Sequence, residues 1–156
     1  AVLSHELSEF RMEAQKLYLG IRQEENDQTE YEDMMIDYTD NVLKQKVFTE
    51  LEQRRFVHMM VEAAESFYTK NPSGMTEKQY ESLCLRLLDI NDFENSEKWC
   101  ERLAEQYPDR LSAFTCKLKL YFIVRNKEAF FRTLDALKQS DVVIDNETLE
   151  LIRIFS

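Results

Sequence analysis

The sequence predicts an all-α protein, an α-solenoid of antiparallel helix hairpins with about eight helices. Only two glycines and two prolines occur among the 156 residues, so few positions favour a tight turn. Apolar residues recur at helical spacing along most of the chain. The segments between the breaks are rich in Leu, Ala, Glu, Lys, Gln and Met, which all favour helix. An apolar fraction of 44% indicates that these helices pack into a folded protein.

Three helices are expected before the clearest break in the chain, Asn71–Gly74. Each carries an apolar stripe that repeats with the period of a helix. Thr49 and, three residues later, Glu52 form a capping-box signature at the start of the third helix. The expected ranges are 2–22, 30–46 and 49–68.

Five further helices are expected after this break. Thr76 and Asn146 are of the residue types that cap the N-terminus of a helix, and they precede the first and the last of the five. Asn95 or Ser96 is expected to start the second of the five, which Pro108 ends because proline cannot continue the backbone hydrogen bonds. The expected ranges are 76–89, 94–107, 111–124, 128–139 and 148–155.

The break at Asn71–Gly74 also divides the chain into two parts. Residues 1–71 contain the N-terminal helices and residues 72–156 the more regular hairpins. We expect both parts to belong to one domain, because neither is large enough to bury a comfortable core alone. The chain begins without an initiator methionine and its last helical pattern runs to Phe155, so we expect it to be part of a longer protein.

The chain is acidic, with a net charge of −10 and a pI near 4.8. A nucleic-acid-binding protein would normally carry a basic surface, so we expect no nucleic-acid partner. The charge is unevenly spread, since residues 24–40 hold eight acids and no base while residues 110–138 hold seven bases and two acids. Two interpretations stay open: both stretches are solvated helix faces, or they are an acidic and a basic surface for partners of opposite charge.

Three cysteines, Cys84, Cys100 and Cys116, lie in expected helices. Their number is odd, so reduced structural thiols in an intracellular, cytoplasmic protein are the simplest explanation, with a nuclear location left open. Their wide, equal separation is not a metal-ligand spacing, and only His5 and His58 offer imidazoles. We therefore expect no metal site and no cofactor.

The chain carries no pattern that predicts an enzyme or a membrane protein. No apolar run approaches the roughly 18 residues that cross a bilayer, so direct membrane insertion is not expected. Asp33, Asp37 and Asp40 fall near one helix face but lack a positioned histidine or a calcium-loop glycine, so a solvated face explains them. His58, among charged neighbours on its helix, is expected to be structural.

The helix–turn–helix unit of about 34 residues that ends at Pro108 has the length of a tetratricopeptide repeat. Counted from Glu77, Cys100 and Leu103 depart from the pattern, and Cys84 replaces the usual small glycine. A second, degenerate unit from Leu111 has two aromatic positions filled but Phe130 at a small position. Residues 76–156 therefore resemble a degenerate tetratricopeptide-repeat protein, and another helical repeat or an irregular bundle stays open as an alternative. The matching residues are Tyr80, Leu83, Phe93, Ser96, Pro108, Phe114 and Tyr121.

This resemblance implies a superhelix in which the first helix of each hairpin lines a groove that holds another protein or peptide. It implies a scaffold or docking module of a multiprotein assembly, and the alternative is a ligand- or peptide-sensing domain of a regulatory protein. The apolar groove positions are equally explained as core between adjacent helices, and self-association stays open. Carried onto this chain, the partner-binding positions are Lys78, Glu81, Leu85, Lys119 and Phe122.

Overall fold

The computed structural model describes Glu9, residues 11–13 and residues 28–155. Most of the first expected helix, 2–22, lies outside the described residues, although Glu9 and residues 11–13 are helical. The described part of the chain contains seven α-helices, one 3-10 turn and no strand, which confirms the all-α class and the approximate number of helices. Its elements are α2 (Gln28–Leu43), α3 (Glu50–Lys70), η1 (Pro72–Gly74), α4 (Glu77–Asp89), α5 (Phe93–Gln106), α6 (Leu111–Ile123), α7 (Lys127–Gln139) and α8 (Asn146–Phe155).

The chain divides into two compact units, Ala1–Gln79 and Tyr80–Ser156, and we describe each by itself. The division lies within α4, after the turn at residues 71–74 that separates the two parts expected from the sequence. The first unit therefore ends with the first residues of α4, and the second begins with Tyr80 on the same helix.

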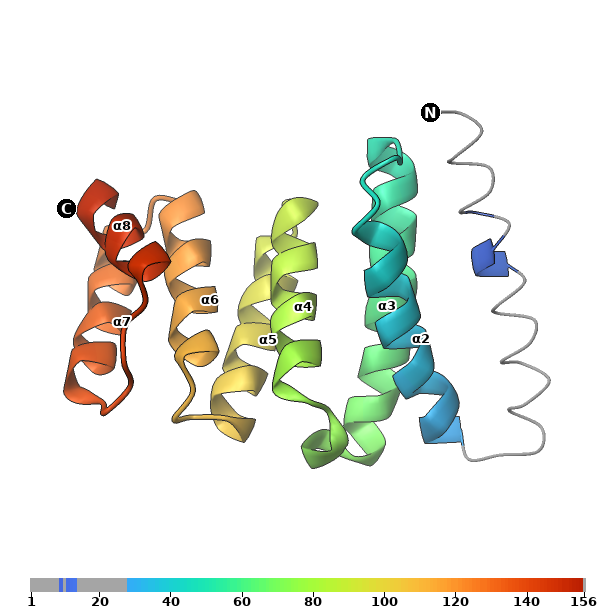
Figure 1. The fold of residues 1–156 in the computed structure, drawn as a ribbon, viewed down its shortest axis with the longest axis horizontal. Coiled ribbons are helices and arrows are strands. Elements are labelled where there is room, and N and C mark those ends of the chain that lie inside the picture. The colour runs from blue at the N-terminus through green and yellow to red at the C-terminus, as the bar shows by residue number, and fades with distance from the viewer. Residues whose placement is uncertain (1–8, 10, 14–27, 156) are drawn as a thin grey trace. The chain divides into compact units, whose positions relative to one another are not determined.

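The first unit is built around the antiparallel hairpin of α2 and α3, which Figure 1 shows side by side. Buried Met35 and Ile36 of α2 and Val57 and Met60 of α3 contribute to its core. The capping box expected at the start of α3 is confirmed. The main-chain N–H of Glu52 donates to the Thr49 hydroxyl at 3.2 Å, and the N–H of Thr49 donates to the Glu52 carboxylate at 3.1 Å.

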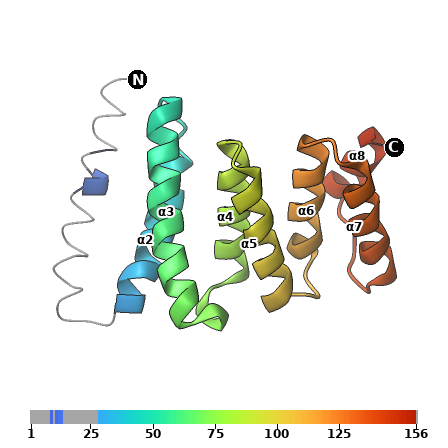
Figure 2. The ribbon, with the colours of Figure 1, turned by 180° about the vertical axis from the view of Figure 1, so that it is seen from behind.

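The helices of the second unit are arranged as two successive hairpins, α4–α5 and α6–α7, followed by α8 (Figure 2). Figure 2 shows α5 and α7 on the side toward the viewer. Five buried side chains of α6, α7 and α8 form one apolar cluster. That cluster consists of Leu118, Phe130, Leu134, Leu137 and Phe155.

The two hairpins close with the same turn. Asn91 and Arg125 both adopt positive φ, 60° and 61°, just after a helix. The N–H of the next residue, Asp92 or Asn126, reaches back to a carbonyl five residues earlier, at 2.9 Å in both turns. This is the Schellman arrangement, which satisfies carbonyl groups at a helix end. The side chain of the same residue then caps the following helix. Asp92 Oδ1 accepts from the main-chain N–H of Asn95 at 3.3 Å, and Asn126 Oδ1 accepts from that of Ala129 at 3.1 Å.

Most expected helix starts agree with the structure, and two differ. Thr76 caps α4 as predicted, because its hydroxyl accepts from the main-chain N–H of Gln79 at 3.1 Å. The prediction that Asn95 or Ser96 starts the next helix is wrong, since Asp92 caps it and α5 begins at Phe93. The last cap was also misplaced. Asp145, and not Asn146, accepts from the N–H of Thr148 at 2.8 Å.

Candidate functional site

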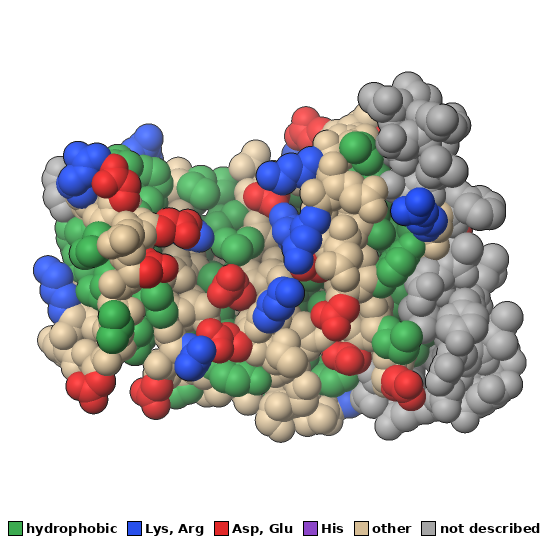
Figure 3. Space-filling view, in the orientation of Figure 1, with side chains coloured by type: hydrophobic (Ala, Val, Ile, Leu, Met, Phe, Trp, Pro, Cys, Tyr) green, Lys and Arg blue, Asp and Glu red, His purple; other side chains and the backbone are tan. Residues whose placement is uncertain are grey.

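Three of the five predicted partner-binding residues lie on α4. Lys78 is exposed, whereas Glu81 and Leu85 are half-buried. Lys78 belongs to the first compact unit, and Glu81 and Leu85 belong to the second. On the face of the second unit that Figure 3 shows, apolar side chains are interspersed with acidic and basic ones.

The other two predicted residues, Lys119 and Phe122, lie on α6 and contact the chain's own last helix. The ammonium group of Lys119 pairs with the carboxylate of Glu147 at 3.1 Å. The ring of Phe122 meets that of Phe155 edge to face, with centroids 5.1 Å apart. The guanidinium of Arg125 lies 5.3 Å from the Phe122 centroid. This side of α6 is therefore engaged by α8.

The opposite side of α6 is open and carries a feature that the sequence did not predict. A cavity of about 390 Å³ is lined by residues of α6 and of the helices on either side of it, α5 and α7, together with Pro108. Figure 2 shows α6 between these two helices. The volume of the cavity is within the range of about 300–1,000 Å³ that is usual for binding pockets. We name it the α5–α7 hollow. It is lined by Ala104, Pro108, Ala113, Phe114, Lys117, Tyr121, Arg132, Thr133 and Ala136.

Small side chains from three helices create this hollow. Ala104 comes from α5, Ala113 from α6 and Ala136 from α7, so none of the three fills the space between the helices. The apolar lining is completed by half-buried Phe114. The sequence contained these alanines, but nothing local indicates that three alanines from different helices come together.

The polar side chains of the hollow are two cations, Lys117 and Arg132, and two hydroxyl-bearing residues, Tyr121 and Thr133. The hydroxyl of Tyr121 donates to the carboxylate of Glu97 at 2.8 Å. Burial, the hydrogen bond to Glu97 and the negative charge of Glu97 all raise the pKa of Tyr121 above its ordinary value. Lys117 has no ion pair with any described residue, and Arg132 approaches the carboxylate of Glu128 only to 4.0 Å. The lining therefore contributes two positive charges and no carboxylate.

A second feature of this unit is a cluster of the three cysteines. Cys84 of α4, Cys100 of α5 and Cys116 of α6 are all free thiols and almost completely buried. Their thiols are close enough to shift one another's pKa values. Burial raises the pKa of Cys84, and the hydrogen bond with Cys100 raises the pKa of Cys116. The two neighbouring thiols lower the pKa of Cys100, because both can donate to its thiolate.

The sequence correctly placed each cysteine in a helix but did not predict that they meet. Their equal separation along the chain could have indicated this meeting, because it is close to the combined length of one helix and the loop that follows it in this unit. The three cysteines consequently lie near the middle of three successive helices, one on each of α4, α5 and α6. Among the described residues, no group of three or more His, Cys, Asp or Glu side chains is arranged to hold a metal ion.

In the first unit, the described part of the acidic stretch is partly buried. Glu32 is only 3% exposed, and one of its carboxylate oxygens, Oε1, accepts from the ammonium of Lys70. Its other oxygen is buried and has no hydrogen-bond partner among the described residues. Gln79 donates to the carboxylates of Asp33 and Asp37, at 2.6 and 3.2 Å. The described part of the stretch is therefore neither a uniformly solvated face nor a freely accessible acidic surface.

One carboxyl group of this region, that of Asp37, has a shifted pKa. The pKa of Asp37 is raised by burial first and then by the negative charges of Asp33 and Asp40, while the hydrogen bond from Gln79 opposes the rise. A second cavity, of about 340 Å³, lies between α2 and α3. It is lined by Tyr31, Glu32, Met35, Met59, Glu62, Ala63 and Ser66.

Comparison of the chain with known proteins found no relative. No protein-family model, curated protein or solved structure matches the chain. Within the described residues, every helix is too short or too polar to cross a membrane.

Proposed function

We propose that this protein is a non-catalytic docking module that holds a segment of another protein within a larger assembly. The observation that carries the proposal is the incomplete covering of α6. This helix is apolar around most of its circumference, and a helix of that kind is normally enclosed on all sides. The helices α5, α7 and α8 pack against α6. Phe114 and Tyr121 of α6 nevertheless remain half-exposed in the α5–α7 hollow.

The way in which α8 binds supports this proposal. It packs through Phe155, whose ring contacts Phe122 of α6 and Phe130 of α7 at centroid distances of 5.1 and 4.6 Å. An ion pair between Lys119 and Glu147 lies beside this apolar contact. A short amphipathic helix thus already docks on one side of α6, and helix-in-groove binding of a partner would use the same kind of contact.

The repeated hairpin turn supports a tetratricopeptide-like arrangement. Asn91 and Arg125 occupy equivalent left-handed positions in the two hairpins. Their separation along the chain matches the length of that repeat, about 34 residues. Stacked hairpins of this type form extended surfaces that contact other proteins. On this proposal, Lys78, Glu81 and Leu85 of α4 remain candidate partner-binding residues. Lys119 and Phe122 would bind a partner only if α8 were displaced.

The proposal is tested by capture followed by direct binding. The full chain is immobilised and exposed to a lysate of its source cells, and the same chain unfolded and blocked serves as the control bait. A protein retained only by the folded bait is then purified and titrated by isothermal calorimetry. We expect saturable binding with one defined stoichiometry. Retention by both baits alike, or no saturable titration, would contradict a docking function.

A further inference from the structure

We infer that the α5–α7 hollow binds an acidic, amphipathic segment of a partner protein, with an apolar side chain inserted in the hollow and a carboxylate held by Lys117 and Arg132. This inference rests on the proposed docking function, because the occupant is part of another protein. It adds to the docking function the surface that binds, the α5–α7 hollow, and the charge of the partner segment, which is negative.

The shape of the hollow favours a side chain over a flat contact. Its volume is about 390 Å³, and alanines from three helices leave the space unfilled. Phe114 and the body of Tyr121 supply apolar walls. The ring of Tyr121 is fixed because its hydroxyl donates to Glu97 at 2.8 Å. An apolar side chain that enters this space gains contact with preformed walls and removes them from water.

The charge of the hollow selects the polar part of the partner. Lys117 is half-buried and has no ion pair with a described residue. Arg132 has only a long contact, 4.0 Å, with Glu128, and both side chains are largely exposed, at 72% and 89%. Such an exposed pair contributes little and can be exchanged for a better one. A carboxylate beside both cations would form charge-assisted hydrogen bonds, whereas a basic partner would be repelled.

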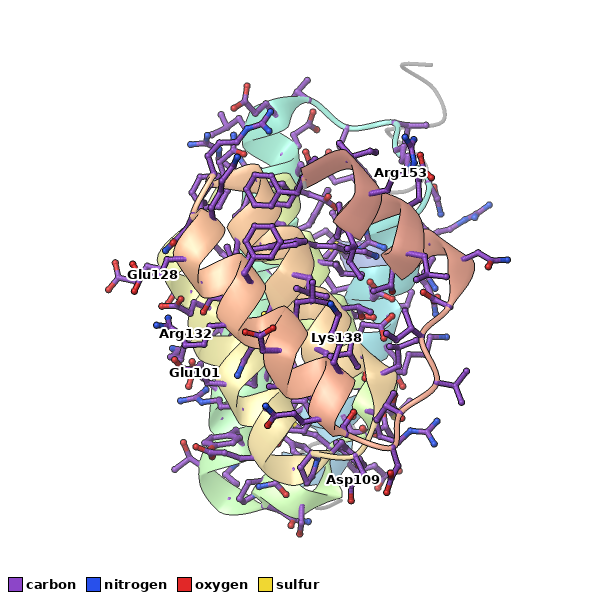
Figure 4. The ribbon with its side chains drawn as sticks, turned by 90° about the vertical axis from the view of Figure 1, so that its left-hand side faces the viewer. Glu101, Asp109, Glu128, Arg132, Lys138 and Arg153 are labelled. Atoms are coloured by element: carbon purple, nitrogen blue, oxygen red, sulfur yellow. The ribbon has the colours of Figure 1, made fainter. Side chains whose placement is uncertain are left out.

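Acidic side chains limit where that carboxylate can bind. Glu97 is bound to Tyr121, and the charges of Glu97 and Glu101 both act on the Tyr121 hydroxyl. Figure 4 shows Glu101, Glu128 and Arg132 projecting from the same edge of the molecule. The carboxylate of the partner therefore belongs beside Lys117 and Arg132, away from the Tyr121 hydroxyl. A helical partner would meet this demand with an acidic residue about one turn from its apolar anchor.

The first arm of the test uses two small probes of opposite charge, 4-phenylbutyrate and 4-phenylbutylamine. Both carry the same ring on a chain of similar length, so only the charged group differs. Carbon-13-labelled alanine methyl groups are followed by NMR, with Ala104, Ala113 and Ala136 as reporters. We expect saturable shifts of these three methyl groups with the carboxylate probe and weaker shifts with the amine. Equal responses to both probes, or none to the carboxylate, would overturn the assigned charge preference.

Charge-reversed variants make the result specific to the hollow. In Lys117→Glu/Arg132→Glu the preference should invert, so that the amine probe binds better. The matched control is Lys138→Glu/Arg153→Glu, which changes the net charge equally at exposed positions outside the lining. Circular-dichroism melts establish that both variants remain folded. The same carboxylate preference in wild type and in Lys117→Glu/Arg132→Glu would place binding elsewhere.

The second arm distinguishes a partner segment from a free organic acid. The protein identified by capture is titrated against wild type and both double variants. We expect Lys117→Glu/Arg132→Glu to weaken its binding by about tenfold or more, as for loss of a close charge contact, and the control variant to bind as wild type does. A partner that binds all three alike overturns this inference and leaves the docking function standing. If no partner binds at all, the docking function fails, and a response to 4-phenylbutyrate would then mark a site for small organic acids.

Discussion

The hydroxyl of Ser96 on α5 donates a hydrogen bond to the main-chain carbonyl oxygen of Cys84 on α4, at 2.9 Å. Both residues are fully buried. A side chain can reach the backbone of a neighbouring helix in this way only where the two helices approach closely. The small residue therefore sets the separation of α4 and α5, and the hydrogen bond satisfies its polar atom inside the core.

We first predict that Ser96 tolerates removal of its hydroxyl better than any increase in size. Ser96→Ala should lower the free energy of unfolding by about 1 kcal/mol, because one buried hydrogen bond is lost. Ser96→Leu should cost more, about 3 kcal/mol, since it forces the helices apart. Urea unfolding measures both, with the exposed Glu105→Ala on the same helix as control. A Leu variant as stable as the Ala variant would contradict close packing here.

The second prediction concerns the docking of α8. Phe155 is 6% exposed and lies in the apolar cluster, whereas the adjacent Ile154 is 56% exposed. Phe155→Ala should lower the free energy of unfolding by about 3–5 kcal/mol, and Ile154→Ala by less than about 1 kcal/mol. Thermal and urea unfolding provide the comparison. If both variants were equally mild, α8 would not be an integral part of this unit, and Lys119 and Phe122 would be accessible to a partner.

A third prediction concerns the ion pair between buried Glu32 and the partly exposed Lys70, whose side chains are 3% and 37% exposed. Lys70→Ala leaves a carboxylate that is 3% exposed without its cation and should lower the free energy of unfolding by about 3 kcal/mol. Replacing both partners with apolar residues, as in Glu32→Leu/Lys70→Met, should recover most of that loss. Urea unfolding compares the free energy of unfolding of the double variant with that of each single variant. A double variant that is less stable than Lys70→Ala would show that the pair contributes net stability.

The fourth prediction uses the cap of α8 and its dependence on pH. The hydrogen bonds to Thr148 lower the pKa of Asp145 below its ordinary value of 3.8. A carboxyl group whose pKa is lower in the folded state stabilises the fold above the unfolded value, and this stability is lost as the pH falls through the folded value. Asp145→Ala should therefore lower the free energy of unfolding by about 1 kcal/mol at neutral pH.

The pH profile of the variants checks the sign of this effect. The difference between wild type and Asp145→Ala should shrink as the pH falls below 3.8. Asp145→Asn keeps a capping oxygen but cannot titrate, so its stability should lack this acidic component. Urea unfolding across the acidic range supplies the measurement. A wild-type advantage over Asp145→Ala that grew toward low pH would contradict the assigned direction of the pKa shift.

The helices were predictable because their signals are local. The capping box at Thr49 and the stop at Pro108 depend on residues within one turn of each other, and both are found where expected. The errors are also local. Asp92 and Asp145 are each followed, within four residues, by another residue type that can cap a helix. Which of the candidates caps the helix depends on the backbone conformation of the preceding turn.

The site was less predictable because it depends on how helices meet. Phe122 was assigned to a groove from its place in the repeat, yet its contact with Phe155 depends on where α8 packs. The α5–α7 hollow requires three small residues, Ala104, Ala113 and Ala136, to come together from three helices. No stretch of sequence as short as one helix contains that information. The binding roles of Lys78, Glu81 and Leu85 stay predictions.

The three clustered thiols have a consequence for how the protein can be handled. All of its cysteines are concealed at one place in the fold, so any complete unfolding exposes them together. In the unfolded chain, the short stretches between successive thiols close small loops at low entropic cost. An oxidant that meets the chain at that moment can join two of them in a disulfide before the helices return. Recovery of the native protein after unfolding should therefore depend on reductant, because the folded state is what protects these thiols from oxidation.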